Sequence, residues 1–258
     1  MHRKLIISAI VISYLVLVTY GLLALNAQII VTSIFLFGIP ALWLAYFSSA
    51  PKPVLISVSL LGVALAVFLE GLAHIYGLWY TMGVDESRLF GLAPVEAIFA
   101  TGLEVVFLVL LYEALFDDGE YTTKPARERM GIFFVMFLGA IGIVAIHQYV
   151  IKDLFINSSY LWIISALLAT CFMMLSLYRT FTIRFLDRFV YFTAFASIPL
   201  LLNLIVSVLN VQKVYAHFAY AAKFNFFGEM VPLEEILLIF TVPILVATIY
   251  EIYLDDVA

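Results

Sequence analysis

About eight apolar runs, each roughly 20 residues long, divide the chain. A helix of about 20 apolar residues is long enough to cross the hydrocarbon core of a bilayer, because an α-helix rises about 1.5 Å per residue. The sequence therefore predicts an all-α polytopic membrane protein with about eight transmembrane helices. The predicted spans cover residues 5–25, 29–47, 54–77, 92–115, 130–151, 159–178, 188–210 and 232–254.

The composition agrees with this class and excludes several others. Hydrophobic residues make up 65% of the chain and charged residues only 12%, whereas a soluble domain carries about 25% charged residues. The net charge of −5 is spread over short loops, so no nucleic-acid partner is expected. The single cysteine, Cys171, excludes an intrachain disulfide and argues against a cysteine-based metal site.

The chain contains an internal repeat with an offset of 138 residues. Pro-x-Glu begins a membrane-length apolar run twice, at Pro94 and at Pro232. Each run then ends in Tyr-Glu followed by Asp-Asp, at 112–118 and again at 250–256. A repeat of this length is a feature of the whole fold, so it guides the domain assignment.

The only long polar linker separates the two copies. We predict a first four-helix repeat over 1–118, a cytoplasmic linker over 119–129 and a second four-helix repeat over 130–258. Because each half holds an even number of spans, the two repeats share one orientation and are parallel.

The basic residues predict the orientation. Most of the 13 Lys and Arg residues flank the ends that face the N-terminal side of the membrane. By the positive-inside rule this side is cytoplasmic, and we expect both termini there, in the plasma membrane. Both Pro-x-Glu motifs then lie at the opposite, non-cytoplasmic ends of their helices.

Several polar residues lie within the predicted spans and gather in the non-cytoplasmic half. Glu70 and His74 are four residues apart and share one helical face. Ionisable residues inside a membrane are costly and are functional candidates by default. We expect a polar pocket between the helices, built from this set: Glu70, His74, Glu96, His147, Gln148, Asn203, Asn210, Glu234 and Glu235. Glu104 lies nearer the middle of its span.

Ordinary structural roles stay open for these groups. Proline in the first turn with glutamate after it is a common helix start, since proline has no N–H to leave unpaired and the carboxylate faces the positive end of the helix dipole. His74 could be a packed interfacial histidine. For Glu113 and Glu251, near the cytoplasmic boundary, we expect solvated helix ends.

The absence of several motifs from the sequence argues against several classes of protein. The sequence holds no G-x-G-x-x-G after a strand, which argues against a dinucleotide fold. It holds no aspartate-rich diphosphate motif, no mid-membrane lysine for a retinal Schiff base and no histidine-rich cluster for a di-iron centre. Neither a metal nor another cofactor is expected.

The two motifs resemble the signatures of a known enzyme family. Gly91-Leu92-Ala93-Pro94-Val95-Glu96-Ala97-Ile98-Phe99 and Gly228-Glu229-Met230-Val231-Pro232-Leu233-Glu234-Glu235-Ile236 are similar to those of the membrane-integral lycopene β-cyclases, in the fused form that joins two subunits in one chain. The resemblance covers nearly the whole sequence. Ala97 departs from the family pattern, which often has a second acid at that position.

The resemblance implies a redox-neutral isomerisation in carotenoid biosynthesis. A proton adds to the terminal C=C of a ψ-end of lycopene, the neighbouring double bond attacks the tertiary cation, and loss of a proton leaves a β-ionone ring. Burial can keep a membrane carboxyl protonated, and two adjacent carboxyls do not ionise independently. We therefore expect Glu234 as general acid, Glu235 as its tuning partner or base, and Glu96 as the matching group of the first half.

The remaining site candidates are assigned to substrate contact or proton supply: Glu70, His74, Glu104, Asn203, Pro94 and Pro232. The substrate would enter from the lipid, and a homo-oligomer stays open. Two alternatives remain. A carotenoid hydratase would capture the same cation with water, and its Glu-containing helix before a Gly-Leu-x-Pro stretch is compatible with 70–94. A membrane transporter also uses repeats with intramembrane carboxylates.

Overall fold

The structure, a computed structural model, describes residues 2–48, 52–75, 78–84, 87–89, 93–117, 159–177, 183–215 and 220–254, with scattered residues between 131 and 142. The predicted linker, most of the predicted span 130–151, and the second Asp-Asp pair lie outside the described residues. So do the candidate pocket residues His147 and Gln148.

The described part is mostly helical, as predicted for a membrane protein. Among the described residues, five helical segments are long and apolar enough to cross a membrane: Lys4–Ala24, Ile29–Phe47, Val95–Leu115, Leu186–Leu209 and Leu233–Ile252. Two further helices carry shorter apolar stretches, at Leu55–Gly71 and Ile163–Leu177. The described residues therefore support the membrane class, while the count of eight spans stays a prediction.

The helices match the predicted runs closely, apart from three starts. Their bounds are α1 (His2–Ala24), α2 (Ile29–Ser33), the π-helix η1 (Ile34–Gly38), α3 (Ile39–Phe47), α4 (Lys52–Ile75), α5 (Val95–Leu115), α7 (Ser159–Leu177), α8 (Ile183–Leu209) and α9 (Leu233–Leu254). Helix α8 begins five residues earlier than predicted and α1 three residues earlier, whereas α5 begins three residues later.

Pro40 coincides with a local change of helix type. Proline has no N–H, so the regular bond to the carbonyl four residues back cannot form. The preceding segment η1 is wound as a π-helix, and the Ile39 N–H donates to the carbonyl of Ile34, five residues back. The span 29–47 thereby continues as one helical rod through α2, η1 and α3.

Contacts divide the chain into two compact units, 1–119 with 196–214 and 120–195 with 215–258. Within the first unit, α5 packs against α4 and against the α2–η1–α3 rod; within the second, α9 packs against α7. In both units the helix that follows a Pro-x-Glu motif thus contacts the second helix of its own repeat. The predicted repeat boundaries remain a prediction.

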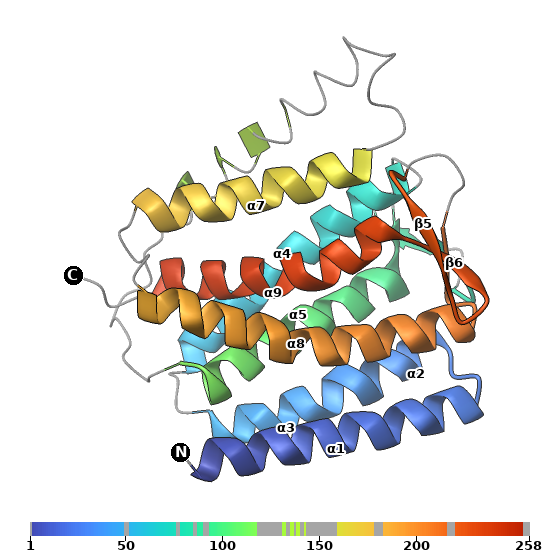
Figure 1. Cartoon of the computed structure of the whole chain (residues 1–258), viewed down its shortest axis with the longest axis horizontal. Helices are drawn as coiled ribbons and strands as arrows, with labels where there is room; N and C mark the ends of the chain where they lie inside the picture. The colour runs from blue at the N-terminus through green and yellow to red at the C-terminus, as the bar shows by residue number, and fades with distance from the viewer. Residues whose placement is uncertain are drawn as a thin grey trace. The chain divides into compact units, whose positions relative to one another are not determined.

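Short strands precede both Pro-x-Glu helices, which the sequence did not predict. Strands β2 (Arg88–Leu89) and β3 (Ala93–Pro94) pair antiparallel, as do β5 (Lys223–Phe226) and β6 (Glu229–Pro232). Figure 1 shows the β5–β6 hairpin leading directly into α9. Strands β1 (Trp79–Thr81) and β4 (Lys213–Tyr215) complete the set.

The two hairpins place the motifs in the same local geometry. Each proline is the last residue of a strand rather than part of the first helical turn, and the helix begins at the next residue. A basic residue is the strand partner of each proline, Arg88 for Pro94 and Lys223 for Pro232. The backbone structure around the motif is therefore the same in both copies. Each proline lies one residue before its helix, whereas in a proline-started helix it would be the first helical residue.

The first helical N–H of each copy is also bound in the same way. Val95 N–H donates to the Ser87 carbonyl at 3.2 Å, and Leu233 N–H donates to the Ala222 carbonyl at 2.9 Å. The first N–H groups of a helix lack partners within the helix. In each copy the hairpin segment provides an acceptor for one of these N–H groups. It thereby fixes the start of the helix whose first turn carries the glutamate.

Gly62 permits close approach of α4 and α5. A Cβ at this position would lie 2.2 Å from Cγ1 of Val105, whereas a Cβ at Gly21 in α1 would meet nothing within 4 Å. We expect Gly62→Ala to lower the free energy of unfolding by about 1–3 kcal/mol, since overpacking forces side chains or backbone to move. Gly21→Ala is the matched control and should be neutral or slightly stabilising, because alanine favours helix.

Thermal unfolding of the purified protein in detergent measures this effect. The double variant Gly62→Ala with Val105→Ala should recover part of the loss, because the clashing methyl group is gone. Equal melting temperatures for Gly62→Ala and Gly21→Ala would show that α4 and α5 do not meet at this glycine.

Candidate functional site

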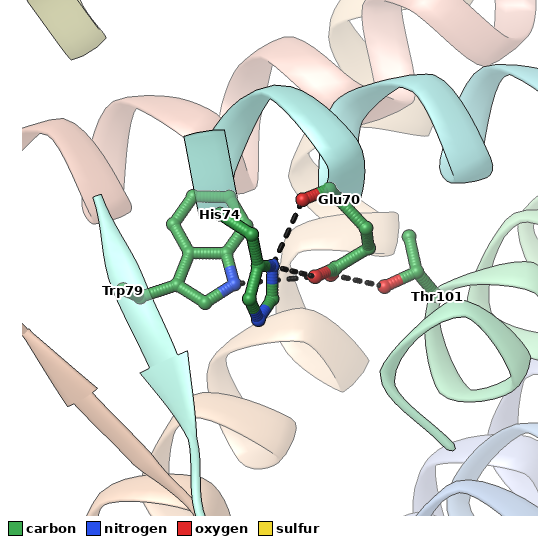
Figure 2. A network of polar contacts seen from close by, with 4 residues as sticks. All are labelled: Glu70, His74, Trp79 and Thr101. Carbon is green, nitrogen blue, oxygen red and sulfur yellow. Dashed lines mark hydrogen bonds and ion pairs between the residues drawn. The ribbon is translucent and has the colours of Figure 1, made fainter. Parts of the chain in front are cut away.

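Glu70 is the centre of a polar cluster formed by Glu70, His74, Trp79 and Thr101, here called the Glu70 cluster (Figure 2). The Thr101 hydroxyl of α5 donates to Oε1 of Glu70 at 2.7 Å, and the Trp79 indole N–H of β1 donates to Oε2 at 3.3 Å. Glu70 itself is only 6% exposed. Donors from two other elements therefore bind both oxygens of a buried carboxyl group on α4.

The imidazole of His74 has a defined tautomer in this arrangement. Nδ1 lies 2.9 Å from the backbone carbonyl of Glu70 and 3.7 Å from its Oε2. A carbonyl oxygen only accepts hydrogen bonds, so Nδ1 must carry a hydrogen. In the neutral ring Nε2 then has no hydrogen and can accept one, which is the orientation that a carboxylate-backed histidine has in acid–base sites.

Trp79 joins this cluster to a positive charge. The ammonium group of Lys213 lies 4.0 Å from the centre of the Trp79 ring, within range of a cation–π interaction. The neighbouring backbone is fixed by the Met82 N–H, which donates to the carbonyl of Gln212 at 2.8 Å. One indole therefore contacts a carboxyl group at its N–H and an ammonium group at its face.

Glu104 and Asn203 contact each other, and Asn210 has a structural role. The Asn203 amide donates to Oε2 of Glu104 at 3.2 Å, so the glutamate nearest the middle of a span has a polar partner. The Asn210 amide donates instead to the carbonyls of Leu22 and Ala27 in the turn after α1. Asn210 thus satisfies the end of a helix and leaves the set of catalytic candidates.

The first motif lies beside the Glu70 cluster. Helix α4 packs against both β3, which ends in Pro94, and α5, which carries Glu96 in its first turn. Pro94 is buried and Glu96 is half-buried. Within the first unit the structure therefore brings Glu70 and His74 to the same end of the α4–α5 pair as Glu96.

Glu234 of the second motif is completely buried, with 0% exposure. Its Oε1 accepts a short hydrogen bond of 2.5 Å from the backbone N–H of Ala221, just before β5. Among the described residues its Oε2 is buried and has no hydrogen-bond partner. An unsatisfied buried polar atom costs about 1–3 kcal/mol, so such an atom in a membrane span is a candidate for contact with a bound molecule.

Glu235, next to Glu234, has a different surrounding. It is 7% exposed and faces the buried hydroxyl of Tyr215. Burial, followed by the charge of the nearby Glu235 carboxylate, raises the pKa of Tyr215 well above its usual value of 10.0. Tyr215 also packs edge-on against Tyr220, with ring centres 6.2 Å apart. The two adjacent carboxyl groups therefore have separate partners, a backbone N–H for Glu234 and a tyrosine for Glu235.

The prediction of solvated ends for the Tyr-Glu pairs is wrong. Glu113 and Glu251 are 4% and 5% exposed. The hydroxyl of Ser48 donates to Glu113 at 3.0 Å, and Arg188 forms a 3.4 Å ion pair with Glu251.

Sequence reasoning missed Thr101 and the backbone N–H of Ala221. A threonine in a membrane helix usually bonds its own backbone, so nothing in the sequence marks Thr101. Trp79 carried a usable signal, because a buried indole N–H needs an acceptor and Glu70 is nine residues earlier. The predicted pocket shared by all the polar spans stays a prediction.

No family model, curated protein or solved structure matches the chain. The described residues also hold no group of three or more His, Cys, Asp or Glu side chains that could bind a metal ion.

Proposed function

We propose that the chain is a lycopene β-cyclase, an isomerase that closes the ψ-ends of lycopene into β-ionone rings through γ-carotene to β-carotene. The observation that carries the proposal is Glu234. This carboxyl group has one oxygen fixed by the Ala221 N–H and the other buried without a partner among the described residues. A group of this kind suits proton donation to an apolar molecule that itself offers no hydrogen bond.

The reaction makes three demands on the protein. The acid must reach the terminal C=C, the cation must form away from water, and a base must take up the leaving proton. A general acid or base contributes about 10²–10⁴-fold to a rate. The proton that enters and the proton that leaves balance, so the reaction needs neither an oxidant nor a reductant.

The surroundings of the two second-motif carboxyls support different roles for them. Glu234 is assigned as the acid, because its Oε2 can point a proton at the substrate. Glu235 is assigned as the tuning partner or base, because it already interacts with the Tyr215 hydroxyl. The aromatic rings of Tyr215 and Tyr220 lie close by and offer π faces that attract a cation.

The apolar helices around the motifs support entry of a hydrocarbon substrate from the bilayer. Many large apolar side chains on the helices are exposed, as expected for faces that meet lipid. The plasma membrane and a cytoplasmic location for both termini remain part of the proposal.

Expression in bacterial cells that accumulate lycopene tests the proposal. Chromatography of the extracted pigments should show γ- and β-carotene, with an empty vector as control. Hydroxylated acyclic carotenoids would replace cyclisation with hydration as the function. Unchanged lycopene, with the protein present in the membrane fraction, would reject both enzymes and favour the transporter.

A further inference from the structure

The two copies of the motif differ in a complementary way. At the 138-residue offset, Ala97 of the first copy corresponds to Glu235 of the second. The helix before the first motif, α4, however, carries Glu70 and His74 near its end, whereas residues 201–209 at the end of α8, the helix before the second motif, include no ionisable side chain. Each half therefore holds its Pro-x-Glu carboxyl together with one further acid–base group, taken from a different helix in each case.

We propose that His74, positioned by Glu70, is the second acid–base group of the first motif and does there what Glu235 does in the second. The inference rests on the proposed function. His74 is the catalytic residue in this assignment, and Glu70 is a positioning residue that acts through it.

The local packing supports this pairing with Glu96. His74 lies in the last turn of α4, the helix that packs against β3 and α5, on which Pro94 and Glu96 lie. Its side chain is only 5% exposed. The bond from Nδ1 to the Glu70 carbonyl leaves Nε2 as the nitrogen that gains or loses a proton.

Carboxyl groups are the main charged groups on the described elements around His74. Glu70 on its own helix lies 3.7 Å from Nδ1. Helix α5, which packs against α4, carries Glu96 in its first turn and Glu104 and Glu113 farther along. The ammonium group of Lys213 lies 4.0 Å from the centre of the Trp79 ring. Because Glu70 contacts the Nδ1 side of the imidazole, the assigned proton transfer uses Nε2.

The proposed step conserves protons and electrons. Glu96 gives its proton to the terminal C=C of one ψ-end, and the electron pair of the neighbouring C=C closes the ring. Nε2 of His74 then takes a proton from the carbon beside the cation, and the electron pair of that C–H bond forms the ring C=C. The imidazolium ion then releases its proton to water, and a proton from water returns to the Glu96 carboxylate.

A simple structural ion pair between Glu70 and His74 makes a different prediction. Asparagine at position 74 can still donate to the Glu70 carbonyl, because its side-chain amide lies near the place of Nδ1. It has no atom at the place of Nε2. Glutamine reaches the place of Nε2 but cannot exchange a proton as imidazole does. A structural role would tolerate one of these variants, whereas a catalytic role tolerates neither.

The test uses the full chain in lipid nanodiscs with lycopene and chromatography of the products. In a Glu234→Gln background, ring formation that persists reports on the first motif. Adding His74→Asn, His74→Gln or Glu96→Gln should lower that remaining rate at least tenfold. Nitrogen NMR of histidine-labelled wild-type protein, with His74 assigned from its missing signal in His74→Asn, should show a proton on Nδ1 and none on Nε2. Glu70→Gln should alter that signal.

The remaining outcomes separate failure of this inference from failure of the proposed function. The inference is overturned if His74→Asn leaves the remaining rate unchanged, if Glu234→Gln removes all ring formation while the wild type converts lycopene, or if the neutral ring carries its proton on Nε2. If the wild type itself does not convert lycopene, the proposed function fails instead.

Discussion

Replacing Glu234 with glutamine is expected to lower ring formation by about 10²–10⁴-fold, the range that one general acid contributes. Glutamine keeps the size of the side chain and its carbonyl oxygen can still accept from the Ala221 N–H, whereas the transferable proton is lost. The paired acid belongs to the second motif alone, so we expect this half to carry most of the rate. The rate of appearance of cyclic carotenoids in isolated membranes, divided by the amount of folded protein, measures the effect.

Glu229→Gln is the matched control for this experiment. It makes the same change at an exposed glutamate on the strand that leads into the same helix. We expect it to keep the wild-type rate. Equal rates for the two variants would remove Glu234 from the mechanism, and a folded Glu234→Gln protein of wild-type activity would do so by itself.

Replacing Glu70 with alanine is expected to be the most destabilising single change discussed for the fold. It leaves the Thr101 hydroxyl and the Trp79 N–H without their acceptor in a buried region. An unpaired buried donor costs about 1–3 kcal/mol, so the loss of acceptor for both donors should lower the free energy of unfolding by about 2–6 kcal/mol. Denaturant or thermal unfolding in detergent measures it.

Two further variants separate the hydrogen bonds from general loss of packing. Glu70→Gln keeps one acceptor oxygen and should lose less than Glu70→Ala. The double variant Glu70→Ala with Thr101→Val should cost less than the two single changes added together, because removing both partners leaves no orphaned donor at that bond. Additive losses would mean that the bond between Glu70 and Thr101 contributes nothing to stability.

The membrane class followed from the sequence because bilayer thickness sets a minimum length for an apolar helix. The required length places α1, α5 and α9 to within a few residues. It does not place the start of α8, because the first turns of this helix include the charged residues Arg184 and Asp187. A hydropathy pattern marks where an apolar run begins, whereas a helix can extend beyond that run into charged residues.

The hairpins were missed for a related reason. A strand of two to four residues carries too little pattern to recognise, and its stability comes from the backbone partner. The turn between β5 and β6 uses Phe227 and Gly228, both with positive φ (53° and 97°). Asn-Gly or Asp-Gly would have signalled such a turn, whereas phenylalanine does not. The prolines therefore resembled helix starts, although each ends a strand.

The sequence predicted the residues of the candidate site better than it predicted the contacts between them. The four-residue spacing of Glu70 and His74 correctly predicted that the two side chains meet, because residues at this spacing share a helical face. The Glu104–Asn203 contact joins residues on different helices, and only the three-dimensional packing shows it. The contrast between Glu234 and Glu235 also needed the structure, since adjacent glutamates have no difference in sequence that predicts which one contacts Tyr215.

In the proposed reaction a buried carboxyl group protonates lycopene and starts ring closure. The most direct measurement is conversion of lycopene by the purified wild-type protein in nanodiscs made up in D₂O, followed by mass spectrometry of the carotenoids. We predict γ- and β-carotene that carry one solvent-derived deuterium for each ring formed, and formation of these products that is slower by about 10²–10⁴-fold with Glu234→Gln. Recovery of unchanged lycopene from a folded protein, or rings without deuterium, would contradict the account.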